Sequence, residues 1–404
     1  MSLLAGLEEV APPARPLPGL SRLINPVDPV TFEDEYWEKA PLRIARDDPG
    51  YFADLLTLED MDQVLALSDT GLDRVRVVAD GRETPVTELA SSARHNALEA
   101  VYEHFRGGST VIVNSLERRW EPLRRFSCAL GADLSARIQM NIYVTPAGNQ
   151  GFAAHYDTHD VFIAQVHGRK RWRLASQPYP LPLRGQPYDK SQPEPAPDEE
   201  FDLAPGDLLY LPRGTVHSAT ANESTSVHVT VGVHPVLYSE MIEGAVRALF
   251  ASDVRFRGGL PIGFAADPLR QRRAREMFAE LAGALGTGLS PGDMTASAVW
   301  RATSIGLPSL RHHLTDLDGL DRTGLGTSVR PRPGLRFTLT VDQDAARLDF
   351  HGKSVLFPAS VADEIRYLAS GGDLTGAAIP GDLDEPGRLL LVRTLLREGF
   401  LTRG

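Results

Sequence analysis

The feature that most constrains the fold is a series of short segments between residues 137 and 233 in which apolar and polar residues alternate. The segments are Arg137–Val144, Val161–Val166, Arg171–Ala175, Leu208–Leu211 and Ser226–Val233. Such alternation is typical of half-buried β-strands, and turns rich in Gly and Pro separate the segments. The pattern predicts a β-barrel or jelly roll. Residues 177–197, rich in proline and charge, are expected to form a long loop near the barrel mouth.

The chain on either side of this barrel is expected to be largely helical. Before it, the spacing of apolar residues predicts helices in Thr31–Ile44 (ending in an extended segment), Thr57–Ala66 and Val86–Phe105, and strands at Val75–Val78 and Val111–Val113. After it, helices are predicted at Ser239–Phe250, Pro268–Ala282 and Pro291–Ser304. Asp267 is the expected N-cap for Pro268 in a first helical turn.

The last part of the sequence predicts a separate small domain. It has strands at Phe337–Val341 and Ala346–Phe350, and helices at Pro358–Leu368 and Pro386–Glu398. This combination is typical of a winged-helix-like module, and Arg330–Pro333 is expected to be a linker before it. The first 20 residues are expected to fray. The sequence therefore predicts an α+β chain with a barrel domain in residues 1–238, a helical domain in 239–329 and a winged-helix-like domain in 330–404.

Composition excludes several classes of protein. Apolar residues make up 42% of the 404 residues and charged residues 24%, the balance of a globular protein. No apolar run approaches the roughly 20 residues needed to span a bilayer, and Met1–Arg15 lacks the form of a signal peptide. A cytoplasmic location is therefore expected.

The single cysteine, Cys128, excludes a disulfide or a multi-thiolate metal site within one chain, and its apolar neighbours predict burial.

The formal net charge is -11, which disfavours direct binding of nucleic acid because phosphate recognition needs clustered Lys and Arg. Residues 330–404 contain about as many acidic as basic residues, so the predicted winged helix shows no DNA-binding charge pattern. An acidic chain can instead attract a basic protein or peptide.

Three residues have the pattern of a metal site. His155 and Asp157 are two positions apart, so on a strand they point to the same side. His217 follows a Pro-Gly-Asp turn, an apolar strand and a second turn, Pro212-Arg213-Gly214, which is the form of a cupin hairpin. Two imidazoles and one carboxylate are a suitable facial triad for Fe(II), leaving positions open for O₂ and a cosubstrate. Either H-x-D or a lone histidine would be weak by itself; the combination is specific.

Lys170 adds a cation to this pattern. It lies in Gly168-Arg169-Lys170-Arg171-Trp172, and an inward Lys170 could pair with the distal carboxylate of a dianionic cosubstrate. Arg169 and Arg171 are expected to face solvent.

These motifs together resemble the JmjC-type cupin oxygenases, and within them the ribosomal oxygenases, also called the cupin-4 or ROX-type family. The resemblance lies in HYDTHDVFIAQVHGRKRWRL (His155–Leu174) and GDLLYLPRGTVHSA (Gly206–Ala219). Its positions are His155, Asp157, Phe162, Gln165, Gly168, Lys170, Trp172 and His217. An entry segment, Glu35–Leu42, resembles the family as well. The resemblance extends from about residue 30 to about residue 235.

The resemblance implies a JmjC double-stranded β-helix in which His155, Asp157 and His217 bind Fe(II) and Lys170 binds the C5 carboxylate of 2-oxoglutarate. It implies hydroxylation driven by O₂ and oxidative decarboxylation of 2-oxoglutarate, on an Arg or His side chain of a ribosomal protein. It also implies dimerisation through the helical domain and a substrate groove shaped by the C-terminal domain.

Several further residues have expected places around this site. Asn141 and Tyr143, on the preceding strand, are expected to line the pocket as donors. His228 and Thr230 are expected to face the barrel interior. His228 is interpreted as a buried core histidine in preference to a functional one. His159 and His167 are expected at the rim or surface and not as ligands.

Alternative functions remain open at this point. The same chemistry could act on a peptide natural product or a small molecule, because specificity lies in loops and added domains. A degenerate cupin could instead serve as a binding or regulatory protein, against which the intact triad and Lys170 argue. The wider JmjC group also includes histone demethylases, but the sequence shows no histone-reading module.

Overall fold

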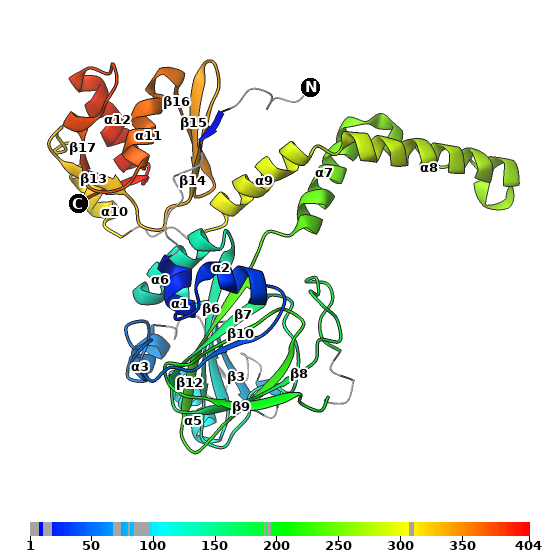
Figure 1. Cartoon of the computed structure of the whole chain (residues 1–404), viewed down its shortest axis with the longest axis vertical. Helices are drawn as coiled ribbons and strands as arrows, with labels where there is room; N and C mark the ends of the chain where they lie inside the picture. Colours follow the sequence, from blue (N-terminus) through cyan, green and yellow to red (C-terminus); the bar gives the residue numbers. More distant parts are fainter. Residues whose placement is uncertain are drawn as a thin grey trace.

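The alternating segments form two sheets that face each other in the computed structural model, which describes residues 8–10, 18–67, 74–79, 81–84, 97–189, 191, 195–306 and 311–404 (Figure 1). The larger sheet has the order β2-β10-β7-β12-β6-β5-β3-β4, and the smaller has the order β11-β8-β9. All of their strand pairs are antiparallel. The strands are β2 (Leu42–Ile44), β3 (Val75–Ala79), β4 (Arg82–Thr84), β5 (Thr110–Val113), β6 (Arg137–Thr145), β7 (Asp160–His167), β8 (Lys170–Ala175), β9 (Glu199–Leu203), β10 (Leu208–Leu211), β11 (Val216–Ala221) and β12 (Ser226–His234).

The two faces of the larger sheet have different partners. On β6, Ile138, Met140 and Ile142 are buried in an apolar core with residues of the N-terminal helices, among them Leu23 and Leu130. The alternate positions turn toward the smaller sheet, because successive side chains of a strand point to opposite faces. The helices beside the larger sheet are α1 (Pro18–Ile24), α2 (Pro29–Thr31), a π-helical turn (Phe32–Tyr36), α3 (Asp60–Ala66), α5 (Ala97–Arg106), a 3-10 turn (Leu116–Arg118) and α6 (Glu121–Asp133).

The predicted strands of this unit are confirmed within one residue at each end, but β4, β9 and β11 were not predicted. The helix predicted at Val86–Phe105 is confirmed from Ala97; its first part, residues 86–96, lies outside the described residues. The 177–197 segment connects β8 to β9 without a helix or strand in its described part, as expected of a loop. Cys128 is buried on α6, as predicted.

Three helices follow the barrel and project from it as an arm (Figure 1). They are α7 (Tyr238–Ser252), α8 (Pro268–Gly288) and α9 (Pro291–Ser304), with 3-10 turns at Val254–Arg257 and Phe264–Ala266. The Asp267 side chain accepts hydrogen bonds from the backbone of Leu269 and Arg270, which confirms the predicted N-cap. Across the described part of the chain, no helix combines the length and the apolar character that a membrane crossing demands.

The C-terminal unit contains two small sheets and three helices. One sheet has the order β1-β14-β15-β16 and the other β17-β13-β18. The elements are α10 (His313–Asp318), β13 (Ser328–Pro331), β14 (Phe337–Val341), β15 (Ala345–Phe350), β16 (Lys353–Pro358), a 3-10 turn (Ala359–Val361), α11 (Ala362–Ala369), β17 (Leu374–Thr375), a 3-10 turn (Gly376–Ala378), α12 (Glu385–Arg397) and β18 (Leu401–Arg403).

Two expectations, one for a linker at Arg330–Pro333 and one for fraying of the first 20 residues, are wrong. The linker predicted at Arg330–Pro333 begins inside β13, where Val329, Arg330 and Pro331 pair with β18. The first 20 residues are also not wholly frayed, because β1 (Glu8–Val10) pairs with β14 of the C-terminal unit. Neither strand is readable locally, since each depends on a partner far away in the sequence.

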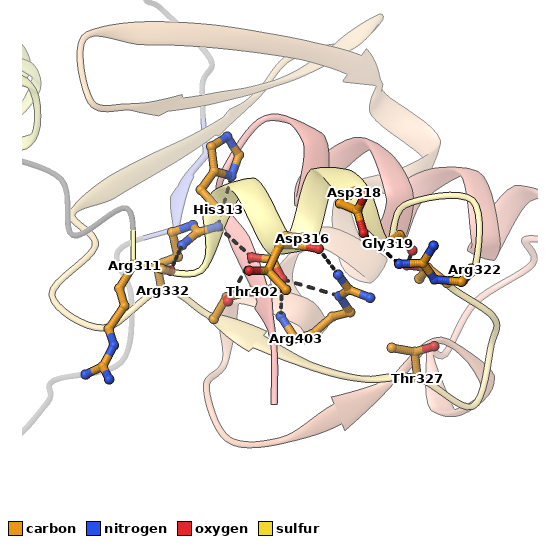
Figure 2. Close-up of polar contacts among 12 residues, drawn as sticks. Arg311, His313, Asp316, Asp318, Gly319, Arg322, Thr327, Arg332, Thr402 and Arg403 are labelled. Carbon is orange, nitrogen blue, oxygen red and sulfur yellow. Dashed lines mark hydrogen bonds and ion pairs between the residues drawn. The ribbon is translucent and has the colours of Figure 1, made fainter.

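A buried ion pair joins α10 to the rest of the C-terminal unit (Figure 2). The Asp316 carboxylate accepts hydrogen bonds from Arg332 Nη2 at 2.8 Å and from Thr402 Oγ1 at 2.9 Å. The backbone N–H of Arg403 also donates to Asp316, at 3.2 Å. The Arg332 and Asp316 side chains are only 1% and 2% exposed. We therefore propose that the C-terminal domain begins before α10, at about residue 311, and not at residue 330; the other divisions of the chain stay as predicted.

Candidate metal centre

The two histidines of the predicted triad are joined directly by their backbones. His155 N–H donates to His217 O at 3.1 Å, and His217 N–H donates to His155 O at 2.8 Å. His217 lies on β11, whereas His155 forms an isolated bridge and Asp157 lies in the loop before β7. One potential ligand atom from each of the three side chains lies within 4.8 Å of the other two. The structure thus brings the predicted triad together, although His155 and Asp157 are not on a regular strand.

Backbone contacts set the orientation of both imidazole rings. His155 Nδ1 lies 2.9 Å from Ala153 O, and His217 Nδ1 lies 3.0 Å from Thr215 O. A carbonyl oxygen only accepts hydrogen bonds, so the proton belongs on each Nδ1. Each Nε2 is then left with a lone pair, which is the arrangement found in histidines that bind metals.

The electrostatics of the site favour the protonation states that a divalent cation needs. Burial, with a contribution from His155, lowers the pKa of His217 to about 4, so its imidazole is neutral. Burial acts to raise the pKa of Asp157, but the surrounding histidines outweigh it and the net shift is downward. Neutral imidazole and ionised carboxylate are the ligand forms for a metal ion. The donor set therefore fits a divalent transition metal such as Fe(II).

The triad opens into a cavity of about 60 Å³ between the two sheets. It is lined by Tyr143, Gly151, Phe152, His155, Asp157, Val161, Ile163, Lys170, Trp172, His217, Ser218, Ala219, His228 and Thr230. Lys170 is 3% exposed, and its Nζ donates to Thr145 Oγ1 at 3.1 Å. No carboxylate of the described residues pairs with it, and burial lowers its pKa to about 7. An anionic ligand would supply the missing counter-charge.

Two other polar atoms on the cavity wall are unsatisfied. His228 Nδ1 and Trp172 Nε1 are buried without a hydrogen-bond partner among the described residues. The His228 ring stacks on the Tyr143 ring, with the two ring centroids 4.8 Å apart. The rings of Trp172 and His228 form a T-shaped pair with centroids 5.7 Å apart. Buried polar atoms are nearly always paired, so this wall is suited to a polar ligand. Burial raises the pKa of Tyr143, which keeps its hydroxyl protonated.

Comparison with known proteins assigns the domain that contains this site. Residues 117–241 match the family model of the JmjC domain. The chain carries a JmjC domain. The match spans α6 and the strands from β6 to β12, and it includes every residue of the triad.

The chain is also similar to curated ribosomal oxygenases. It is 34% identical over 252 residues to ribosomal oxygenase 2 of Rattus norvegicus, covering 59% of this chain and 53% of that protein. It is 31% identical over 258 residues to ribosomal oxygenase 1 of Gallus gallus, covering 59% of this chain and 41% of that protein. The chain thus spans about half the length, or less, of these relatives.

The fold itself extends beyond the JmjC domain in a solved structure. Escherichia coli ribosomal oxygenase YcfD has a TM-score of 0.53 and 19% identity, covering 94% of this chain and 98% of that one. A second YcfD structure, with cobalt and 2-oxoglutarate, has a TM-score of 0.51 and 19% identity, covering 94% of this chain and 98% of that one. The cupin fold expected from the sequence is confirmed.

The hairpin that presents Lys170 depends on Gly168 and Gln165. Gly168 has a φ of +62°, and a Cβ there would lie 2.0 Å from Thr225 O, so only glycine fits this turn. Gln165 Nε2 donates to His167 O at 2.8 Å, to Gly168 O at 3.0 Å and to Ser226 Oγ at 2.9 Å. The motif glutamine therefore holds the turn of the JmjC domain instead of lining its cavity.

The strand after this turn alternates as predicted. Lys170 and Trp172 are buried and line the cavity, whereas Arg171 is exposed and pairs with Asp202 at 2.7 Å. Arg169 is also exposed, so the expectation for both arginines is confirmed.

An ion-pair cluster at the turn before His217 was not predicted. Arg213, in the turn before His217, pairs with Asp160 at 2.7 Å and with Glu38. Tyr210 Oη also donates to Asp160, at 3.1 Å. These residues hold the N-terminal segment against the turn that positions His217. Glu38 and Arg213 are far apart in the sequence, so no local signal could have joined them.

The other sequence-predicted residues divide into two groups. Tyr143, His228 and Thr230 line the cavity. Asn141 does not line the cavity, and its Oδ1 accepts from Ser115 N–H at 3.0 Å; its role as a pocket donor stays a prediction. His159 lies beside the triad and stacks on His234 at 4.6 Å.

Proposed function

We propose that this chain is an Fe(II)- and 2-oxoglutarate-dependent oxygenase that hydroxylates a protein side chain. The observation that carries this proposal is the cavity shared by a His-Asp-His triad and a buried Lys170 that has no carboxylate partner among the described residues. In the proposed reaction, 2-oxoglutarate, O₂ and a C–H bond of the substrate give succinate, CO₂ and the hydroxylated product; bound Fe(II) supplies the oxygen-activating chemistry.

Each residue of the site has a distinct part in this proposal. His155, Asp157 and His217 hold the metal through two Nε2 atoms and one carboxylate. Lys170 pairs with the distal carboxylate of 2-oxoglutarate, since a cation at the cavity end fixes the length and direction of a dianion. Thr145, which accepts from Lys170, orients that ammonium group.

For the substrate, we propose an Arg or His side chain of a ribosomal protein. Two of the curated relatives are named ribosomal oxygenases, and one from Drosophila persimilis is named a bifunctional lysine-specific demethylase and histidyl-hydroxylase. The net charge of -11 favours an encounter with a basic protein.

The test is succinate formation from 2-oxoglutarate under air by the iron-loaded chain, with and without added substrate fractions. Stimulation by a ribosomal-protein fraction, with a mass increase of one oxygen on an Arg or His, is the expected result. Stimulation only by a metabolite or peptide fraction would keep the chemistry but reject the ribosomal substrate. Failure of every fraction to support turnover would favour a binding protein.

The first prediction concerns Lys170. In Lys170→Ala, the concentration of 2-oxoglutarate needed for half-maximal turnover is expected to rise by at least about 30-fold, because a buried charge pair is lost. The matched control is Arg171→Ala, which removes the neighbouring exposed cation and should change this concentration little. Similar affinities for 2-oxoglutarate in Lys170→Ala and the wild type would contradict the assignment.

We further propose that the helical arm pairs two copies of the chain. The helices α7 and α9 contain no buried residue, and α8 contains only Ala274. Large apolar side chains are nevertheless exposed along the arm, including Tyr238 at 92%, Phe278 at 58% and Trp300 at 52%. Helices of globular proteins are stabilised mainly by burying an apolar face, so this arm requires a partner.

A second prediction follows for the arm. Ala274, Phe278, Leu281 and Leu285 share one face of α8 by helical spacing. Phe278→Glu is expected to convert a dimer to a monomer in light-scattering measurements, because a carboxylate would be buried in the interface. Arg272→Glu, an exposed change on the same helix, is the control and should leave the dimer intact. A wild-type monomer at all concentrations would contradict the proposal.

A further inference from the structure

A second cavity lies between the JmjC domain and the C-terminal unit. Its volume is about 60 Å³, and it shares no lining residue with the metal-site cavity. The lining residues are Ser115, Glu117, Arg118, Ser127, Cys128, Arg137, Ile138, Thr303, Ile305, Gly306, Gly334, Arg336 and His351. They come from the 3-10 turn at Leu116–Arg118 and the residue before it, α6, β6, the end of α9 with the residues after it, and the C-terminal unit, so a bound ligand would contact several parts of the chain.

Two polar atoms from the C-terminal unit are unsatisfied at this cavity. Arg336 Nη1 and His351 Nε2 are buried without a hydrogen-bond partner among the described residues. Burial lowers the pKa of Arg336 to about 10, and no carboxylate of the described residues forms an ion pair with it. A partly buried guanidinium without a counter-charge is destabilising, and a bound anion would offset this cost.

The position of Arg336 is built by two glycines. A Cβ on Gly306 would lie 2.5 Å from Arg336 Nη2, and one on Gly131 would lie 3.2 Å from the same atom. Larger residues at these positions would displace the guanidinium. Arg336 is thus a packed component of the joint between α6 and the end of α9, and not a loose surface side chain.

The charges around the cavity are unbalanced. Arg118 and Arg137 line it together with Arg336, against one carboxylate, Glu117. Glu117 is already engaged, because it accepts from Met140 N–H at 2.9 Å and lies 3.7 Å from Arg118 Nε. The excess positive charge therefore attracts an anion.

We propose that this cavity binds a small oxyanion of the phosphate class, held by Arg336 and His351, at the joint between the two units. Guanidinium groups match the geometry of such anions by donating paired hydrogen bonds. The cavity volume fits a free ion with its waters better than a nucleotide. The two cavities share no lining residue, so occupancy of this cavity does not require the proposed oxygenase activity.

The test is calorimetric titration of the full chain with inorganic phosphate at constant ionic strength. Saturable binding by the wild type is expected, and Arg336→Gln should weaken it by about tenfold or more. Arg322→Gln, which removes an exposed arginine of the C-terminal unit, should bind like the wild type. Absence of saturable binding by the wild type, or equal binding by Arg336→Gln, would overturn the proposal.

Thermal melting distinguishes loss of the site from loss of the fold. Phosphate should raise the melting temperature of the wild type but not of Arg336→Gln. If Arg336→Gln does not fold, His351→Asn serves instead, because Asn tolerates the positive φ of that position. It should also lose the phosphate-induced shift, and retention of the full shift would overturn the role of His351. A parallel titration with glucose 6-phosphate should show weaker binding; tighter binding would overturn the assignment to a free ion.

Discussion

His217→Ala is expected to reduce the turnover of 2-oxoglutarate by more than about 100-fold, because loss of even an outer-shell partner of a metal ligand typically costs 10- to 100-fold. The imidazole supplies one of three proposed protein ligands, and its Nδ1 is already fixed by Thr215 O at 3.0 Å. Succinate release from 2-oxoglutarate, measured with saturating Fe(II), gives the rate. His217→Ala also leaves the backbone pair with His155 in place.

His167→Ala is the matched control for this variant. His167 belongs to the same barrel, at the end of β7, but it does not line the metal-site cavity. Its turnover should equal that of the wild type. Equal turnover in His217→Ala and His167→Ala would show that the triad is not the reaction centre.

Asp316→Ala is expected to destabilise the C-terminal unit by about 3–5 kcal/mol, the usual effect of removing one partner of a buried ion pair. The substitution leaves Arg332, 1% exposed, without its carboxylate, and it also removes the acceptor of Thr402 Oγ1 (Figure 2). Urea unfolding followed by hydrogen exchange in α10, β13 and β18 measures the effect in this unit.

The control for Asp316→Ala lies two residues away on the same helix. Asp318 pairs with Arg322, and their side chains are 77% and 72% exposed. Exposed pairs contribute little, so Asp318→Ala should change the unfolding free energy by less than about 1 kcal/mol. Equal losses in the two variants would mean that the buried ion pair does not stabilise the unit.

The parts of the fold that sequence reasoning predicted were those with a strong local pattern. Strands β6 and β12 alternate clearly, because one face packs on an apolar core and the other faces the cavity. Strand β9 was missed because Glu199–Leu203 is acidic; its charges are satisfied across the sheet, where Glu200 and Asp202 pair with arginines of β8. Strand β11 was missed because it consists mostly of small and polar residues.

The site divides in the same way. The triad and Lys170 follow from residue type and spacing, and the structure brings them to one cavity. The contacts that hold the segments around the site in place do not follow from the spacing of residues. Arg213 forms an ion pair with Glu38, which is distant in the sequence. Asn141 Oδ1 accepts a hydrogen bond from the backbone N–H of Ser115, and an alternating strand pattern cannot show such a contact.

The proposed metal centre is tested most directly by anaerobic titration of the full chain with Fe(II) and then with 2-oxoglutarate, monitored by visible absorption. The expected result is one Fe(II) per chain and a charge-transfer band when 2-oxoglutarate chelates the metal. In Asp157→Ala both signals should be lost or strongly weakened. Full Fe(II) binding and an unchanged band in Asp157→Ala, or no band in the wild type, would contradict the proposed metal centre.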